Sequence, residues 1–142
     1  MEEIKTLQRK ILEKKYKLVV IKNKETIFTS NKNGIVPMYD FYNSKTSGDI
    51  FIADKFIGGG AAKLLLEMNV HIEELYAQII SESALVLLKE KDVKISYDKK
   101  VEKILNRTGD DLCPVEKISQ NNDKFEDFYK ELSAFLKKTK QI

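Results

Sequence analysis

Cysteine and histidine are nearly absent from this chain of 142 residues, which contains one of each. One cysteine excludes a disulfide within the chain. One cysteine and one histidine also exclude a zinc site built only from these residue types, because such a site needs at least three ligands. No apolar run reaches the roughly 18 residues that cross a bilayer, and residues 1–5 contain no apolar signal core. We therefore expect a reduced, cytoplasmic protein without a membrane span.

An excess of charge of one sign is also lacking. The chain has 25 basic and 22 acidic residues, a net charge of +3, and the two signs are interspersed. This balance creates no strong field for nucleic acid or membrane, and the tyrosines that could stack on bases are not organised with a basic stripe. Apolar residues make up 42% of the chain and charged residues 33%, which suits one globular domain with a densely charged surface. We expect neither a membrane nor a nucleic acid as partner.

The periodicity of the apolar residues predicts an α/β fold. The expected helices span residues 3–14, 35–43, 61–68 and 81–89, and the expected strands span residues 16–22, 26–29, 49–54, 75–80 and 93–97. The first two strands form a hairpin, and the later strands alternate with helices at short spacing, which predicts parallel pairing with right-handed crossovers. The result is a three-layer α/β/α sandwich around a mixed five-stranded sheet, in which an antiparallel hairpin precedes the parallel strands.

Residues 119–142 form a linker and an amphipathic helix that follow the α/β domain of residues 1–118. The apolar side chains of this helix share one face, and they are Phe125, Phe128, Tyr129, Leu132, Phe135 and Leu136. That face packs either on the domain itself or on a partner subunit in a homo-oligomer. We favour the first, because most amphipathic helices serve the core of their own domain.

Polar residues follow one of the buried strands, where an open α/β sheet binds its ligands. Asp54 and Lys55 end the strand, and Gly58, Gly59 and Gly60 lead into the next helix. Glycine amides can approach an anion closely, and the helix dipole favours negative charge there. A tight turn with close helix–sheet packing explains the same glycines without any ligand.

Two further segments have polar residues at the expected start of a helix. Ser81 is a good N-cap, and Glu82 suits the positive end of the helix dipole, so a ligand role would be additional to capping. Cys113 is expected at the N-cap of a short helix with Pro114 at its first position, and Glu116 is placed to complete a capping box.

Cys113 has two interpretations. A thiol at a helix N-terminus is more easily ionised, which raises its reactivity, and Lys55 or Arg107 near it could orient a substrate anion. A buried, inert structural cysteine is the alternative. His71 is not a candidate base for this thiol, because it precedes its strand and so lies at the opposite edge of the sheet.

A hard cation could bind the oxygen atoms of Asp110, Asp111 and Glu116. We favour solvated turn residues with one helix cap as the explanation of these acids. We therefore expect no bound metal.

Several short stretches, taken in order, resemble one known family. They are Gly34-Ile35-Val36-Pro37, Ala53-Asp54-Lys55-Phe56-Ile57-Gly58, Ala61-Ala62, Ile80-Ser81-Glu82-Ser83-Ala84-Leu85, Asn106-Arg107 and Cys113-Pro114-Val115-Glu116. Over residues 16–118 they resemble the domain-of-unknown-function family eighteen ninety-three, whose fold is similar to that of cytidine deaminase; the helix after Asp123 lies outside this stretch. The resemblance implies a three-layer α/β/α domain and no established activity. The family pattern usually has Lys-Ala where this chain has Gly59-Gly60.

The deaminase-like fold does not imply deaminase chemistry here. Zinc deaminases need an H-x-E motif at one helix start and a P-C-x-x-C motif at the next. The corresponding segments, residues 34–37 and 54–60, contain neither histidine nor cysteine. A zinc-dependent deaminase is therefore excluded, and no cofactor is expected.

Two functions remain open. The first is a metal-independent domain that binds a small anionic or nucleotide-like ligand, and that is an enzyme if Cys113, Asp54 and Lys55 act as catalytic residues. The ligand-binding candidates are Gly58, Gly59, Gly60, Ser81, Glu82, Asn106, Arg107 and Glu116. The alternative is a non-catalytic interaction domain whose polar motifs are caps and turns, and whose partner surface is the tail helix or the edge strand of the hairpin.

Overall fold

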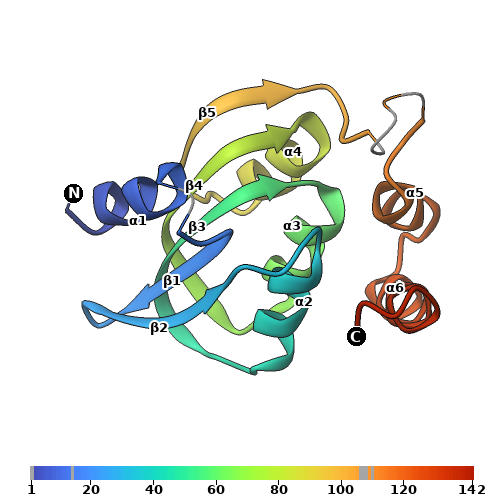
Figure 1. Cartoon of the computed structure of the whole chain (residues 1–142), viewed down its shortest axis with the longest axis horizontal. Helices are drawn as coiled ribbons and strands as arrows, with labels where there is room; N and C mark the ends of the chain where they lie inside the picture. The colour runs from blue at the N-terminus through green and yellow to red at the C-terminus, as the bar shows by residue number, and fades with distance from the viewer. Residues whose placement is uncertain (1, 14, 106–108, 110) are drawn as a thin grey trace.

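A mixed five-stranded sheet lies at the centre of the molecule (Figure 1). The computed structural model of the chain describes residues 2–13, 15–105, 109 and 111–142. Its strands are β1 (Leu18–Lys22), β2 (Glu25–Ser30), β3 (Gly48–Ile57), β4 (Val70–Ser81) and β5 (Ile95–Val101). They lie in the order β2-β1-β3-β4-β5; β1 runs antiparallel to β2 and β3, and β3, β4 and β5 are parallel. The predicted α/β class and mixed sheet are confirmed.

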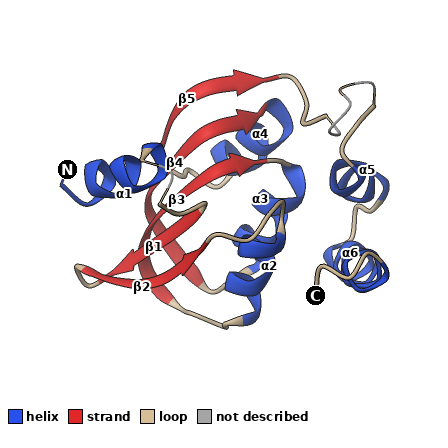
Figure 2. Cartoon of the chain, viewed as in Figure 1, coloured by secondary structure: helices blue, strands red, loops and turns tan. Residues whose placement is uncertain are grey.

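Helices cover both faces of this sheet (Figure 2). They are α1 (Glu2–Leu12), α2 (Val36–Asn43), α3 (Gly59–Glu67), α4 (Glu82–Glu90), α5 (Pro114–Asn121) and α6 (Phe125–Lys138). α1 lies on one face and packs on β1, β3 and β4, whereas α2, α3 and α4 lie on the other. α5 and α6 form a further layer outside α2 and α3, so the second face is covered twice (Figure 1). α5 also runs through residue 118, where we expected the domain to end.

Both central strands are longer than the sequence pattern indicated. β3 was expected to end at Asp54, but Phe56 and Ile57 continue its ladder to Ile79 and Ile80 of β4. The reason is that the parallel neighbour supplies hydrogen-bond partners to residues that a turn signal alone would assign to a loop. This extension carries Asp54 into the body of the sheet instead of leaving it at the strand end.

The alternation of side chains along the strands divides the core into two clusters. Val19 of β1 and Tyr76 of β4 face α1, where they pack with Leu7 and Ile11. The larger cluster lies on the opposite face, and its members include Leu18, Ile52, Leu75, Phe41, Leu64, Phe128 and Leu136. Strands buried on both faces explain the near-continuous apolar runs in β1, β3 and β4.

The turn between β1 and β2 has no glycine. Asn23 and Lys24 have φ angles of 52° and 65°, and Glu25 already belongs to β2. Two consecutive residues with positive φ are typical of the tight hairpin turn whose twist matches that of the strands. The predicted turn at residues 23–25 is therefore present, shorter by one residue.

The apolar face of α6 is buried by its own chain. Phe128, Leu132 and Leu136 are fully buried in the main core cluster. The ring of Tyr129 stacks on that of Tyr39 from α2, with 5.6 Å between the ring centroids. The apolar stripe that could have marked a subunit contact is therefore filled within the molecule. None of the described helices is long and apolar enough to cross a membrane.

Candidate functional site

A pocket of about 770 Å³ opens beside the carboxyl end of β3. Its lining comes from segments far apart in the sequence: the residue before β1, the loop into α2, the end of β3, the start of α3, the segment after β5, the start of α5 and the end of α6. The lining residues are Lys17, Asn33, Gly34, Ile35, Met38, Asp54, Lys55, Phe56, Gly58, Ala61, Ile104, Leu105, Cys113, Pro114, Val115, Glu116, Phe135 and Gln141. This volume lies in the range of small-molecule sites, about 300–1,000 Å³.

Asp54 is one of two buried carboxyl groups that line this pocket, and Glu116 is the other. Asp54 is only 6% exposed. It lies on β3, between β1 and β4, where it pairs with Leu18 of β1 and Ala77 of β4. The backbone N–H groups of Phe56 and Lys55 donate to its carboxyl, the first at a long 3.4 Å. Burial raises the pKa of Asp54 to about 8, because these two contacts only partly offset the loss of water. The carboxyl is therefore mostly protonated at neutral pH.

Two lysines line the same pocket. The N–H of Lys55 donates to the carbonyl oxygen of Lys17 at 2.9 Å, so the two backbones run side by side. The Lys17 ammonium donates to the side-chain oxygen of Asn33, and the Lys55 ammonium lies 5.7 Å from the centre of the Phe56 ring. Within the described part of the chain, neither ammonium forms an ion pair with a carboxylate.

Cys113 lines the pocket from the start of α5. It is the N-cap residue of that helix and Pro114 follows in the first turn, as predicted. Its backbone N–H donates to the carbonyl oxygen of Ile104 at 3.0 Å, which joins α5 to the segment after β5. The thiol is free and partly exposed, and it makes no capping hydrogen bond. Cys113 is therefore a partly exposed residue of the pocket lining whose thiol does not cap α5.

Glu116 does not complete a capping box, so that prediction is wrong. Its carboxylate turns away from the start of α5 and accepts hydrogen bonds from the N–H groups of Gly59 and Gly60 and from the hydroxyl of Ser83. Burial raises the pKa of Glu116, and these hydrogen bonds act in the opposite direction. The cause is the docking of α5 on α3, which brings the carboxylate to the N-terminus of α3, where negative charge is favourable.

The glycine run allows this close approach. A Cβ on Gly60 would lie 2.9 Å from Cγ1 of Val115, and one on Gly58 would collide with the Glu116 carboxylate. The amides of Gly59 and Gly60 already have an anionic partner from the same chain. An anion site at this loop would need free amides at the start of α3. Glu116 already accepts hydrogen bonds from these amides.

Ser81 and Glu82 lie outside the pocket. Oγ of Ser81 accepts from the N–H of Ala84 at 3.2 Å, which confirms the predicted N-cap of α4. Ser81 is fully buried, whereas Glu82 is exposed and pairs with Lys100 at 3.8 Å. Asn106 and Arg107 lie outside the described residues.

The pocket lining thus includes some of the candidate site residues predicted from the sequence. Asp54, Lys55, Gly58, Cys113 and Glu116 line it; Gly59, Gly60, Ser81 and Glu82 do not. Sequence reasoning missed the lining residues from other segments, chiefly Lys17, Asn33, Ile35, Met38, Phe135 and Gln141. Only Lys17 had a signal in the sequence, because an antiparallel hairpin strand next to β3 places it beside Lys55.

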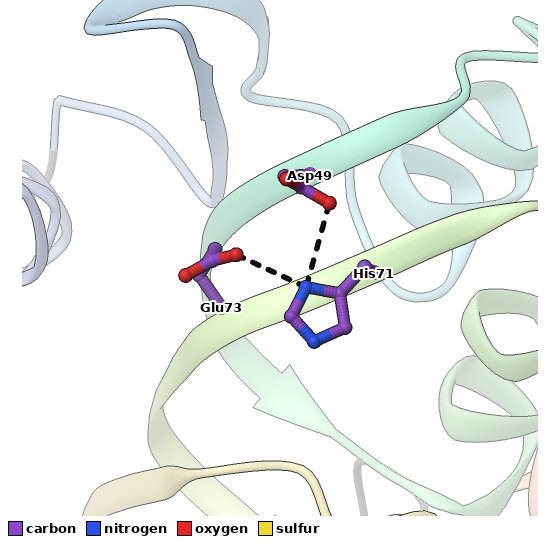
Figure 3. A group of neighbouring side chains, drawn as sticks. All are labelled: Asp49, His71 and Glu73. Carbon is purple, nitrogen blue, oxygen red and sulfur yellow. Dashed lines mark hydrogen bonds and ion pairs between the residues drawn. The ribbon is translucent and has the colours of Figure 1, made fainter.

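His71 is the second residue of β4 and does not precede its strand, but it lies at the amino end of that strand, whereas Cys113 lines the pocket beside the carboxyl end of β3. Figure 3 shows His71 with Asp49 and Glu73. The Nδ1 atom of His71 is 3.0 Å from Oε1 of Glu73 and 3.4 Å from Oδ1 of Asp49, which pairs with His71 in the ladder of β3 and β4. One donor atom from each residue lies within 4.8 Å of the others, a spacing that a divalent cation could bridge. All three side chains are exposed, and exposed ion pairs adopt the same geometry without a metal.

The acidic turn after β5 was the other place considered for a cation. Asp110 lies outside the described residues, and Asp111 pairs with Lys117. The Lys117 ammonium lowers the pKa of Asp111, and Glu116 faces α3 as described above. Of the three acids considered as oxygen ligands, the two that the structure describes, Asp111 and Glu116, thus bond to different partners.

Most of the chain resembles a solved structure. A crystal structure of a DUF1893 family protein (TM1506) from Thermotoga maritima matches it with a TM-score of 0.77 and 28% sequence identity, covering 92% of this chain and 90% of that chain. No functionally curated protein matches the chain. The family model "TM1506: Domain of unknown function (DUF1893)" matches residues 7–136. This match is longer than the expected 16–118 and takes in most of α6. The chain therefore belongs to the DUF1893 family.

Proposed function

We propose that this protein binds a small organic molecule in the pocket beside β3, without a metal ion. The observation that carries the proposal is Asp54, a carboxyl that is only 6% exposed, faces a pocket of about 770 Å³ and, among the described residues, accepts hydrogen bonds from backbone N–H groups alone. A buried polar group without a strong partner is costly unless something else uses it. Apolar walls with a few convergent polar groups are typical of ligand sites.

The same pocket supports an enzymatic version of this proposal. Cys113 would act as the nucleophile, since this residue lines the pocket from a helix start and its thiol is free. A protonated Asp54 would donate a proton, and Lys55 would orient negative charge on the substrate. The anionic or nucleotide-like ligand suggested by the sequence belongs to the same proposal.

The alternative is an interaction domain without catalysis. The apolar face of α6 is covered by the chain, which leaves the open edge strand β2, with Ile27 41% exposed, as its partner surface. The cytidine deaminase-like fold likewise stays a prediction. A mixed five-stranded sheet with helices on both faces is compatible with it.

Thermal melting in the presence of a metabolite panel tests the proposal. A ligand at about a hundredfold above its dissociation constant should add ~2.7 kcal/mol of stability. The same ligand should slow alkylation of Cys113, the only thiol in the chain. Cys113→Ser is the control, because it should take up no reagent. A panel in which no compound raises the melting temperature or protects Cys113 would contradict the proposal.

A further inference from the structure

The polar groups around the pocket differ in how far the protein itself satisfies them. Glu116 is fully engaged, since its carboxylate accepts from Gly59, Gly60 and Ser83. From the residues that the structure describes, Asp54 receives only two backbone N–H contacts, one of them 3.4 Å long. The pocket therefore contains one carboxyl that is satisfied and one that can bond to a ligand.

The cations of the pocket are also available to a ligand. Lys17 contacts the neutral side chain of Asn33, and Lys55 lies beside the ring of Phe56. Among the residues that the structure describes, no carboxylate lies within ion-pair distance of either ammonium. The titratable groups that line the pocket are these two lysines, Asp54, Glu116 and Cys113.

We propose that the pocket is specific for a small carboxylic acid with an apolar body. Its carboxylate is bound by Lys17 and Lys55, and an oxygen of the ligand accepts a hydrogen bond from Asp54. The apolar body packs against Met38 and Phe135, which line the pocket from α2 and α6. This inference rests on the proposed function and names the ligand class of the same site.

A phosphate is disfavoured by the same contacts. Phosphate sites commonly use the N–H groups at a helix start. Here the amides of Gly59 and Gly60 at the start of α3 are bonded to Glu116, so a phosphate would have to displace a buried carboxylate. A neutral ligand would forgo the two ammonium groups. A singly charged carboxylate fits both conditions.

Three compounds with the same phenyl body test this ligand class on the full chain. They are 3-phenylpropionate, phenyl phosphate and 3-phenyl-1-propanol, titrated at pH 6.5 and low salt with detection by NMR chemical shifts. We expect 3-phenylpropionate to bind about tenfold more tightly than either of the others, a difference of ~1.4 kcal/mol. Equal or tighter binding of the phosphate or the alcohol would overturn the inference.

Variants of the two lysines locate the carboxylate. Lys17→Ala combined with Lys55→Ala should weaken binding of 3-phenylpropionate about tenfold, because the double variant removes both ammonium groups that bind the carboxylate, and solvent screens part of their effect. Binding of 3-phenyl-1-propanol should not change. Lys99→Ala, exposed on β5 and outside the pocket, is the matched control. An unchanged affinity in the double variant would overturn the inference.

Asp54→Asn tests the proton donor. The Asn side chain keeps a donor at all pH values, whereas burial raises the pKa of Asp54 to about 8. Binding to the natural chain should fall by up to about tenfold per pH unit above that pH, and the variant should lose this dependence. An identical pH profile for both proteins would contradict the role of Asp54; if the variant does not fold, the lysine variants carry the test.

The two proposals fail in different ways. If phenyl phosphate or the alcohol binds best in this pocket, the ligand class is wrong while the proposed function stands. If no phenyl compound binds but a compound of the metabolite panel protects Cys113, only the inference is overturned. If neither set of compounds binds or protects Cys113, both are wrong.

Discussion

The two ends of β3 place an aspartate in opposite environments. At its amino end, Asp49 is exposed and pairs with His71 across the parallel ladder (Figure 3). Toward its carboxyl end, Asp54 is buried and faces the pocket, and within the described part of the chain only two backbone N–H groups donate to it. Water solvates the exposed group whatever its partners, whereas the buried one must be neutral or strongly hydrogen-bonded. Two aspartates on one strand therefore have different chemistry, because the helices cover only one of them.

The largest expected effect is that of Asp54→Asn on stability. Burial raises the pKa of Asp54 from 3.8 to about 8 in the folded chain. Below about pH 4 the carboxyl is protonated in both states. As the pH rises toward 8 the unfolded chain loses the proton first, so the free energy of unfolding should fall by up to about 1.4 kcal/mol per pH unit.

Urea unfolding across this pH range measures the effect. The Asn variant should be more stable than the natural chain by a few kcal/mol at pH 7, and its stability should lack this pH dependence. Asp49→Asn on the same strand is the matched control, with no comparable change expected because Asp49 is exposed. Parallel pH curves for the natural chain and Asp54→Asn would show that Asp54 is ionised in the folded state.

Glu116→Ala should have the next largest effect. It removes the acceptor of the N–H groups of Gly59 and Gly60 and leaves these donors buried. We expect a loss of about 2–3 kcal/mol in unfolding free energy. Glu116→Gln keeps an acceptor and should lose less. Glu73→Ala, at the exposed amino end of β4, is the control and should change stability by under ~0.5 kcal/mol. A loss as small as this for Glu116→Ala would show that the Glu116 carboxylate does not stabilise the start of α3.

Ser81→Ala should have a smaller effect. Its hydroxyl caps the N–H of Ala84 at 3.2 Å, and the side chain is fully buried at the end of β4. Loss of an N-cap costs about 1 kcal/mol, measured as a shift of the urea midpoint at constant slope. Ser81→Thr should recover most of this stability if the site has room for one methyl group. An Ala variant as stable as the natural chain would show that the cap is not needed.

The smallest effect is expected for His71→Ala. Its partners Asp49 and Glu73 are exposed, and exposed ion pairs contribute about 0–1 kcal/mol. Removal of the imidazole should therefore change the melting temperature little, with or without added zinc or magnesium. A metal-dependent rise in the melting temperature of the natural chain that His71→Ala abolishes would show that this end of β3 holds a cation.

Much of the fold followed from local patterns in the sequence. The hairpin at residues 23–25, the N-caps Ser81 and Cys113, and the alternation of strands and helices all depend on neighbouring residues. Strand ends were less well predicted, because β3 continues past Asp54 only where β4 supplies partners. The direction of Glu116 was also missed, since a capping box is a local motif whereas its actual partners lie on another helix.

The sequence alone determined the order of the strands and of most helices, the N-cap position of the one cysteine at a short helix, and the lack of the histidine and cysteine ligands that a deaminase zinc site needs. These properties follow from spacing and composition. Only the tertiary structure decided that Asp54 is buried, that Glu116 occupies the glycine amides, and that Lys17 and Phe135 meet Cys113 around one pocket. The reason is physical: burial and pocket walls arise from the packing of segments that are distant in the chain, and no local pattern records them.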